Sequence, residues 1–300
     1  MIPPDVLKKL NAVMRRIELA AAFDGIGCDD FNQATSVKKL AEIAGMSERS
    51  LRDYFKLHTG CRIVDYASTR RAEYAARLLR HFPALNNSAV AQILGFTTRT
   101  GLHNLLRKNG VIGPSSLRES SVPIDEPMPY RIEPNRQFHL FFRLDNLDYD
   151  ECNSPEFEKS SWDLIEDFVK NRWPELRLNS YVGFAIDRYL AGNQDEGIFL
   201  SGILYDCTGA LNLSGDLHGD FGYHKLPAQT YAIFTHKGSY DSLNQFYQQV
   251  FATLNQAKGI EVNPQFPFME RYLNSPSETA ESELVTEILV AITSPTKCSA

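Results

Sequence analysis

The chain has 300 residues, of which 43% are hydrophobic and 23% charged, and its formal net charge at pH 7 is -6. This composition is typical of a folded globular protein and excludes a low-complexity or intrinsically disordered chain. No stretch approaches the roughly 18 consecutive apolar residues that a membrane-spanning helix needs, and the first residues lack the apolar core of a signal peptide. We therefore expect a cytoplasmic protein with no membrane partner, and the length favours two domains over one.

Charge is divided unevenly along the chain. Residues 1–120 hold 18 Lys+Arg against 11 Asp+Glu, a net +7, whereas residues 121–300 hold 13 against 26, a net -13. A basic first part joined to an acidic second part predicts that only the first part meets a polyanion. The five cysteines include no C-x-x-C pair, and for His218 and His224 with Asp220 the neighbouring glycines favour a solvated turn over a metal site. We expect no metal and no cofactor.

The first part of the chain shows helical periodicity almost throughout, with a weak internal duplication. The segment "LAEIAGMSERSLRDYFK" (40–56) is echoed by "VAQILGFTTRTGLHNLLR" (90–107), with Gly45 and Gly95 in register. Each copy combines a short helix, a turn at its glycine, a hydroxyl residue suited to capping, and a second helix with polar residues on one face. This pattern predicts an all-α domain at residues 1–120 with two helix-turn-helix units.

The segment "SSVPIDEPMPYRIEPNRQ" contains four prolines and no apolar period, which predicts an extended linker at residues 121–135. The remainder, residues 136–300, alternates strand-like and helical segments. The expected order is strand 137–145, helix 157–173, strands 180–188 and 197–206, then strand 229–238, helix 240–259, strands 265–273 and 283–292. We therefore predict a multidomain chain whose second domain is an α+β fold of two strand-helix-strand-strand repeats.

The motifs of the first part carry a resemblance to a known family. Residues 36–118 contain "LAEIAGMSERSLRDYFKLHTG", "YASTRRAEYAARLL", "VAQILGF" and "GPSSLR" in order, and they resemble the DNA-binding domain of AraC-family transcription regulators. The second unit departs from the family pattern, because Leu102, Leu106 and Arg107 stand where two phenylalanines and a lysine are usual. The resemblance implies double-stranded DNA as a partner, with weaker binding expected from the second unit.

A second resemblance covers residues 137–292. The segments "LPAQTYAIFTHKGSYDSL" and "PFMERYL" are similar to those of GyrI-like small-molecule-binding domains, and an AraC-type reader followed by this domain is the arrangement of Rob-type regulators. This implies a transcription regulator that binds a small-molecule effector, with RNA polymerase as a further partner. Two alternatives stay open: a small-molecule hydrolase, and a module that binds protein through its acidic surface.

The second helix of each unit is expected to enter the major groove with its N-terminal half. The residues expected to read bases are Glu48, Arg49, Ser50, Arg52 and Asp53 in the first unit, and Thr98, Arg99, Thr100 and His103 in the second. Those expected to meet phosphates are Lys56, Arg107 and Lys108. A carboxylate near phosphates is repelled unless it accepts from a cytosine amine or orients an arginine, and Asp53 has the alternative role of bracing Arg49 or Arg52. The competing interpretation of the arginines is an ordinary solvated helix face.

Glu270 is the candidate ligand-binding carboxylate of the second part. In "QFPFMERYL" strand alternation places it on one face with Phe266, Phe268 and Tyr272, and a charge among aromatic rings needs compensation. The GyrI-like resemblance implies that this glutamate faces a cationic or lipophilic ligand; the alternative is a salt bridge with Arg271 or an open edge position. Other aromatic residues expected to wall the site are Trp162, Phe168, Tyr205 and Tyr231.

Overall fold

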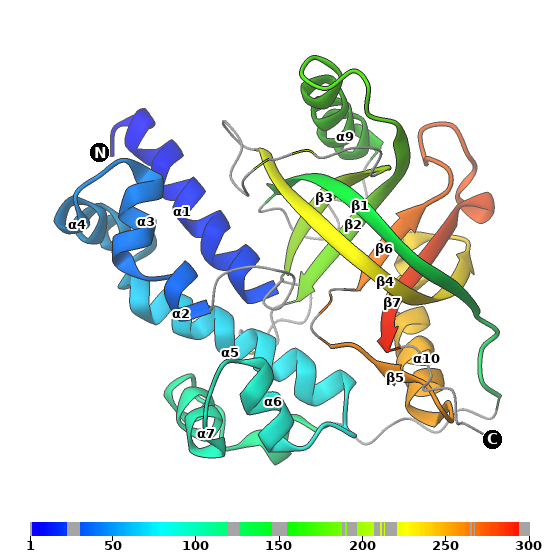
Figure 1. The fold of residues 1–300 in the computed structure, drawn as a ribbon, viewed down its shortest axis with the longest axis horizontal. Coiled ribbons are helices and arrows are strands. Elements are labelled where there is room, and N and C mark those ends of the chain that lie inside the picture. Colours follow the sequence, from blue (N-terminus) through cyan, green and yellow to red (C-terminus); the bar gives the residue numbers. More distant parts are fainter. Residues whose placement is uncertain are drawn as a thin grey trace. The chain divides into compact units, whose positions relative to one another are not determined.

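A computed structural model describes residues 2–22, 31–118, 126–145, 155–187, 190, 197–206, 211, 213, 221–264, 266 and 268–293 (Figure 1). The chain divides into two compact units, one formed by Met1–Ser120 with Tyr189–Asn193 and the other by Ser121–Arg188 with Gln194–Ala300. None of the helices in the described ranges is long and apolar enough to cross a membrane.

The elements that the structure describes in the first unit are all helices. Its helices are α1 (Pro4–Ala22), α2 (Phe31–Ala34), α3 (Val37–Ala44), α4 (Glu48–Thr59), α5 (Ile63–His81), α6 (Asn87–Ile93) and α7 (Arg99–Lys108), followed by the 3-10 turn η1 (Pro114–Leu117). Helices α3 and α4 form the first helix-turn-helix, and α6 and α7 the second. The all-α prediction with its two units is therefore confirmed.

Local chemistry explains where the helices of the two units begin and end. Gly45 and Gly95 have φ angles of 57° and 71°, the left-handed conformation that glycine adopts without steric cost. Ser47 caps α4 by accepting from the Ser50 amide at 3.1 Å, and Thr98 caps α7 by accepting from the Gly101 amide at 3.4 Å. The duplicated glycine and hydroxyl positions thus shape the same turn twice.

In its described residues the second unit combines a seven-stranded antiparallel sheet with two α-helices. Its elements are β1 (Arg131–Asp145), α9 (Pro155–Lys170), β2 (Leu178–Asp187), β3 (Gly197–Asp206), β4 (Phe221–Lys237), η2 (Tyr240–Ser242), α10 (Leu243–Gln256), β5 (Glu261–Val262), β6 (Met269–Tyr272), η3 (Glu281–Glu283) and β7 (Val285–Thr293). The succession β1-α9-β2-β3 and β4-α10-β6-β7 gives the two expected strand-helix-strand-strand repeats, so the α+β prediction is confirmed. The strand order is β4-β1-β3-β2-β6-β7-β5, and β4 also pairs with β7, which closes the sheet on itself.

The sheet begins earlier than the proline pattern predicts. Strand β1 starts at Arg131, inside the stretch expected to be linker, because Arg131 and Glu133 already pair with β4. The register between the two strands shifts after Glu133, next to Pro134, which has no amide hydrogen for the ladder. Strand β6 is shorter than the predicted 265–273, since only Met269–Tyr272 is paired.

The two described α-helices of this unit, α9 and α10, cover the same face of the sheet. Tyr272 on β6 lies opposite Tyr181 on β2 and packs against the apolar cluster under α9, which includes Phe141, Trp162 and Ile165. Two residues earlier on the same strand, Glu270 lies opposite Ile288 of β7, which belongs to the apolar cluster under α10. Because side chains two apart share a face of a strand, Glu270 and Tyr272 lie where the two helix-covered halves of the sheet meet.

Candidate nucleic-acid interface and candidate ligand site

Helix α4 presents the predicted base-reading residues on its solvent side. Leu51 and Phe55 are completely buried and anchor the opposite side. Ser50 is half-buried, with its hydroxyl 2.9 Å from that of Ser47. The other predicted residues of this helix are exposed: Glu48, Arg49, Arg52, Asp53 and Lys56. Exposure of these side chains is what contact with a DNA groove requires.

The brace on Arg52 differs from the one suggested by the sequence. Arg52 Nη2 donates to Glu48 Oε2 at 2.7 Å, one helical turn earlier, so the partner is Glu48 and not Asp53. The physical reason is spacing: residues four apart meet on a helix surface, whereas adjacent residues point in different directions. Both side chains are about half exposed, and such a pair contributes only about 0.3–0.5 kcal/mol. Arg52 can therefore exchange this carboxylate for another acceptor at little cost.

Helix α7 presents a similar face in the second unit. The exposed predicted residues there are Thr98, Arg99, Thr100, His103, Arg107 and Lys108. Lys108 Nζ, however, donates to Asp65 Oδ1 of α5 at 3.0 Å, and Asp65 also accepts from Arg62 Nε at 2.6 Å. The hydrogen bond from Arg62 and then that from Lys108 lower the pKa of Asp65 to about 2. Lys108 thus ties the end of α7 to the start of α5.

Helix α5 joins the two helix-turn-helix units rigidly, passing from the α3–α4 pair to the α6–α7 pair (Figure 1). Arg71, which is buried, donates to the Leu94 carbonyl and to Asn32 and lies 4.1 Å from the centre of the Phe96 ring. Thr69 donates to Asn109 at 2.9 Å just beyond α7. These contacts fix α5 to the α6–α7 unit and to α2, which directly precedes the α3–α4 unit.

Glu270 is a buried carboxylate of the second unit, with 5% of its surface exposed. Its Oε2 accepts from the Tyr272 hydroxyl at 2.6 Å, and its Oε1 accepts from the Tyr247 hydroxyl of α10 at 3.0 Å. Burial and the neighbouring Glu270 charge raise the pKa of Tyr272 well above its ordinary value, so the phenol stays protonated and remains a donor. The salt bridge with Arg271 considered from the sequence is not formed. Arg271 lies on the opposite face and pairs with Glu287 at 2.6 Å.

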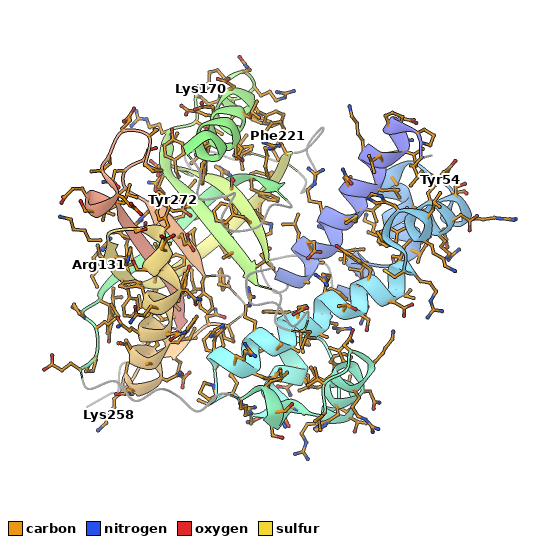
Figure 2. All side chains as sticks on the ribbon, turned by 180° about the vertical axis from the view of Figure 1, so that it is seen from behind. Tyr54, Arg131, Lys170, Phe221, Lys258 and Tyr272 are labelled. Carbon is orange, nitrogen blue, oxygen red and sulfur yellow. The ribbon has the colours of Figure 1, made fainter. Side chains whose placement is uncertain are left out.

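Aromatic rings surround the Tyr272 side of this carboxylate. Figure 2 shows Tyr272 between α9 and α10. Its ring meets Trp162 edge-on at 5.5 Å and Tyr240 at 5.8 Å. Gly183 of β2 lies directly opposite Glu270, and a Cβ added there would stand 2.5 Å from the Tyr272 hydroxyl. The glycine therefore leaves the space through which Tyr272 reaches Glu270.

The structure brings together only part of the predicted aromatic wall. Tyr272 donates to Glu270 and meets Trp162 edge-on, and Trp162, Phe168 and Tyr205 belong to the cluster under α9 against which Tyr272 packs. Within that cluster Phe168 stacks on Phe221 at 4.2 Å. Tyr231 lies on the other face of the sheet, so its assignment to this wall is wrong. Its cross-strand partner is Ala291, three residues beyond the partner of Glu270, and an odd offset reverses the face.

Comparisons with known proteins bear on both units. A family model described as a helix-turn-helix domain matches residues 40–120, and the GyrI-like small molecule binding domain matches residues 178–293. The chain joins an AraC-type helix-turn-helix domain to a GyrI-like domain. These two domains are those of a DNA-binding transcription regulator with a small-molecule-binding part.

Solved structures of similar fold are distant from this chain. EcmrR in a complex with DNA is 14% identical, with 86% of this chain and 99% of that chain covered and a TM-score of 0.43. SAV2435 bound to tetraphenylphosphonium is 15% identical over 55% of this chain and 94% of that chain, with a TM-score of 0.36. A hydrolase from Listeria innocua is 9% identical over 56% of this chain and 94% of that chain, with a TM-score of 0.39. No curated protein matches the chain.

Tyr247, whose hydroxyl contacts Glu270, is not among the residues expected at this site from the sequence. It is a partly apolar residue on an amphipathic helix, and no local signal distinguishes it from a core position. For the metal alternative, His218 and Asp220 lie outside the described residues. Within the described ranges no group of three or more His, Cys, Asp or Glu side chains is suited to hold a metal ion.

Proposed function

We propose that this chain is a transcription regulator whose helices α4 and α7 read two major-groove segments and whose GyrI-like domain binds an aromatic or lipophilic cation at Glu270. The observation that carries the ligand assignment is the buried Glu270 carboxylate, held by two tyrosine hydroxyls beside aromatic rings. Arg49, Arg52 and Arg99 are the proposed base readers, since an arginine fork can bond both acceptors of guanine.

The electrostatics of the GyrI-like site favour a cation. A buried carboxylate is costly unless it is hydrogen-bonded or paired, and the two tyrosines supply the hydrogen bonds that keep Glu270 oriented. The faces of Trp162, Tyr240 and Tyr272 carry partial negative charge, which attracts a cation near the same point. A bound cation would be attracted both by the Glu270 carboxylate and by the faces of these rings. Its apolar groups would displace water from the ring surfaces.

The Glu270 site is linked through α10 to residues 128–130, which precede β1. Helix α10, which supplies Tyr247, also holds Met128, because the Met128 amide donates to the Thr253 hydroxyl at 3.0 Å. Tyr130 packs on Phe234 at 5.2 Å beneath the same helix. We propose that a ligand that shifts α10 also moves residues 126–130, which follow the helix-turn-helix domain in the sequence.

Binding is a better proposal than hydrolysis for this site. The hydroxyls that contact Glu270 belong to tyrosines, and the raised pKa of Tyr272 makes it a poor nucleophile at neutral pH. Turnover of p-nitrophenyl esters by the wild-type chain, lost in Glu270→Gln, would favour the hydrolase instead.

Calorimetry tests the ligand assignment directly. Tetraphenylphosphonium serves as the cationic probe, and triphenylphosphine oxide as a neutral aromatic of related shape. We expect the wild type to prefer the cation and Glu270→Gln to weaken its binding at least tenfold, about 1.4 kcal/mol. The control Glu261→Gln removes the same charge from an exposed position in the domain and should leave affinity unchanged. Equal weakening in both variants would reduce the role of Glu270 to long-range charge.

A further inference from the structure

A row of buried polar side chains crosses three strands next to Glu270. His236 on β4 lies opposite Thr286 on β7, and Thr286 lies opposite Tyr272 on β6. Cross-strand partners share a face, so all three lie on the Glu270 side of the sheet. His236 is 7% exposed and Thr286 is fully buried.

The hydrogen bonds of His236 define its tautomer. The Ser242 hydroxyl donates its single proton to the Ser239 carbonyl at 2.7 Å, so in its 2.7 Å contact with His236 it accepts from Nε2. Burial lowers the pKa of His236, which favours the neutral ring. With its proton on Nε2, a neutral ring presents Nδ1 as an acceptor. Among the described residues this buried Nδ1 has no hydrogen-bond partner.

Thr286, the cross-strand partner of His236, carries a second polar atom of the same kind. Its buried Oγ1 likewise has no hydrogen-bond partner within the described part of the chain. Directly opposed residues in an antiparallel pair have Cβ atoms about 4.5–5.5 Å apart, so one small polar group can reach both atoms. Buried polar atoms are almost always hydrogen-bonded in native proteins, and two neighbouring exceptions call for a common partner.

We propose that His236 Nδ1 and Thr286 Oγ1 form a second subsite of the ligand site, which takes a carboxamide group of the effector. The amide N–H donates to Nδ1, and the amide oxygen accepts from the threonine hydroxyl. This inference rests on the proposed function, since the same molecule places its cation at Glu270.

The surrounding elements define the rest of the effector. Phe246 of α10 meets the His236 ring edge-on at 4.9 Å, and Tyr240 of η2 packs on Tyr272, so aromatic rings cover the row between its two ends. Strands β4 and β6 are separated by β7, and Glu270 stands two residues along β6 from Tyr272, the end of the row. Two strand spacings across and two residues along place His236 and Glu270 about 12 Å apart. The effector class is therefore a lipophilic cation with a carboxamide about 12 Å from its charge.

A matched pair of probes tests this subsite in the full chain. (7-Carbamoylheptyl)triphenylphosphonium and (8-methylnonyl)triphenylphosphonium share the cation and the spacer, and the amide oxygen and nitrogen of the first are replaced by two methyl groups in the second. The measured quantity is the ratio of their dissociation constants, alkyl over amide. We expect Thr286→Val, which keeps shape and removes the hydroxyl, to lower this ratio about tenfold, and His236→Leu to do the same.

Two control variants separate the possible outcomes. Thr235→Val lies one residue from His236 on β4, on the opposite face and exposed, and should leave the ratio unchanged. Glu270→Gln should weaken both probes equally and also leave the ratio unchanged. A ratio in Thr286→Val equal to that of the wild type would overturn the subsite and assign the two atoms to a structural water only. If Glu270→Gln weakened neither probe, or if neither probe bound the wild type, the proposed function itself would fall and the subsite with it.

Discussion

Removing the Tyr272 hydroxyl should destabilise the GyrI-like domain measurably. Tyr272 donates to a buried carboxylate at 2.6 Å, whereas Tyr247 donates to the same group at 3.0 Å. A hydrogen bond to a charged group contributes about 1.5–3 kcal/mol, and shorter charge-assisted bonds lie towards the upper end. We therefore expect Tyr272→Phe to lower the free energy of unfolding by about 2–3 kcal/mol, and Tyr247→Phe by about 1.5 kcal/mol.

Tryptophan fluorescence measures this domain within the full chain. The sequence has only two tryptophans, Trp162 and Trp173, and both lie in the GyrI-like unit. A urea titration followed at these residues thus reports on that domain alone. In a Glu270→Gln background the Tyr272→Phe effect should shrink, because the charged acceptor is gone. The control Tyr66→Phe removes a 2.6 Å bond to Glu18 in the helical unit and should not move the tryptophan transition. Losses below about 0.5 kcal/mol, or a larger effect at Tyr247 than at Tyr272, would refute this reasoning.

Three further predictions concern single side chains. Arg49→Ala should cost about 1–3 kcal/mol of binding to the operator and relax base choice at one position, and Arg99→Ala should cost less; competition binding against random DNA checks both, and equal losses on the two DNAs would indicate phosphate contact only. Burial lowers the pKa of His236, so its contribution to stability is present above the unfolded pKa of about 6.5 and is lost as pH falls towards the folded pKa. Between about pH 7.5 and 5.5 the unfolding free energy of His236→Gln, followed by tryptophan fluorescence, should therefore fall less than that of the wild type. An identical fall in both proteins would contradict this. Gly183→Ala should weaken tetraphenylphosphonium binding by moving the Tyr272 hydroxyl off Glu270, which calorimetry detects; unchanged affinity would show that the site tolerates the extra methyl group.

Most of the helical domain could be predicted from the sequence because its signals are local. The apolar period, the left-handed glycines Gly45 and Gly95 and the capping hydroxyls each act within one or two turns of the chain. The sequence suggests Asp53 as a brace for Arg49 or Arg52, whereas the partner of Arg52 is Glu48, which stands four residues before it and follows the same local rule. Attention to that spacing would have found it.

The ligand site was less predictable because its geometry depends on strand register. Alternation along β4 gives the relative faces of its residues, but only pairing with β7 shows that His236 shares the face of Glu270 and that Tyr231 does not. The start of β1 at Arg131 likewise depends on partners about a hundred residues later in the chain. Tyr247 reaches Glu270 from a helix, and no sequence spacing relates the two residues.

The most direct test of the account is transcription in vitro from the promoter that footprinting of the purified protein on its own upstream region identifies. Wild type and Glu270→Gln are compared across a titration with tetraphenylphosphonium. The account predicts that transcript level changes with the cation for the wild type, and that Glu270→Gln needs at least tenfold more cation while its binding to DNA alone is unchanged. A transcript level that ignores the cation, or the same midpoint for both proteins, would contradict it.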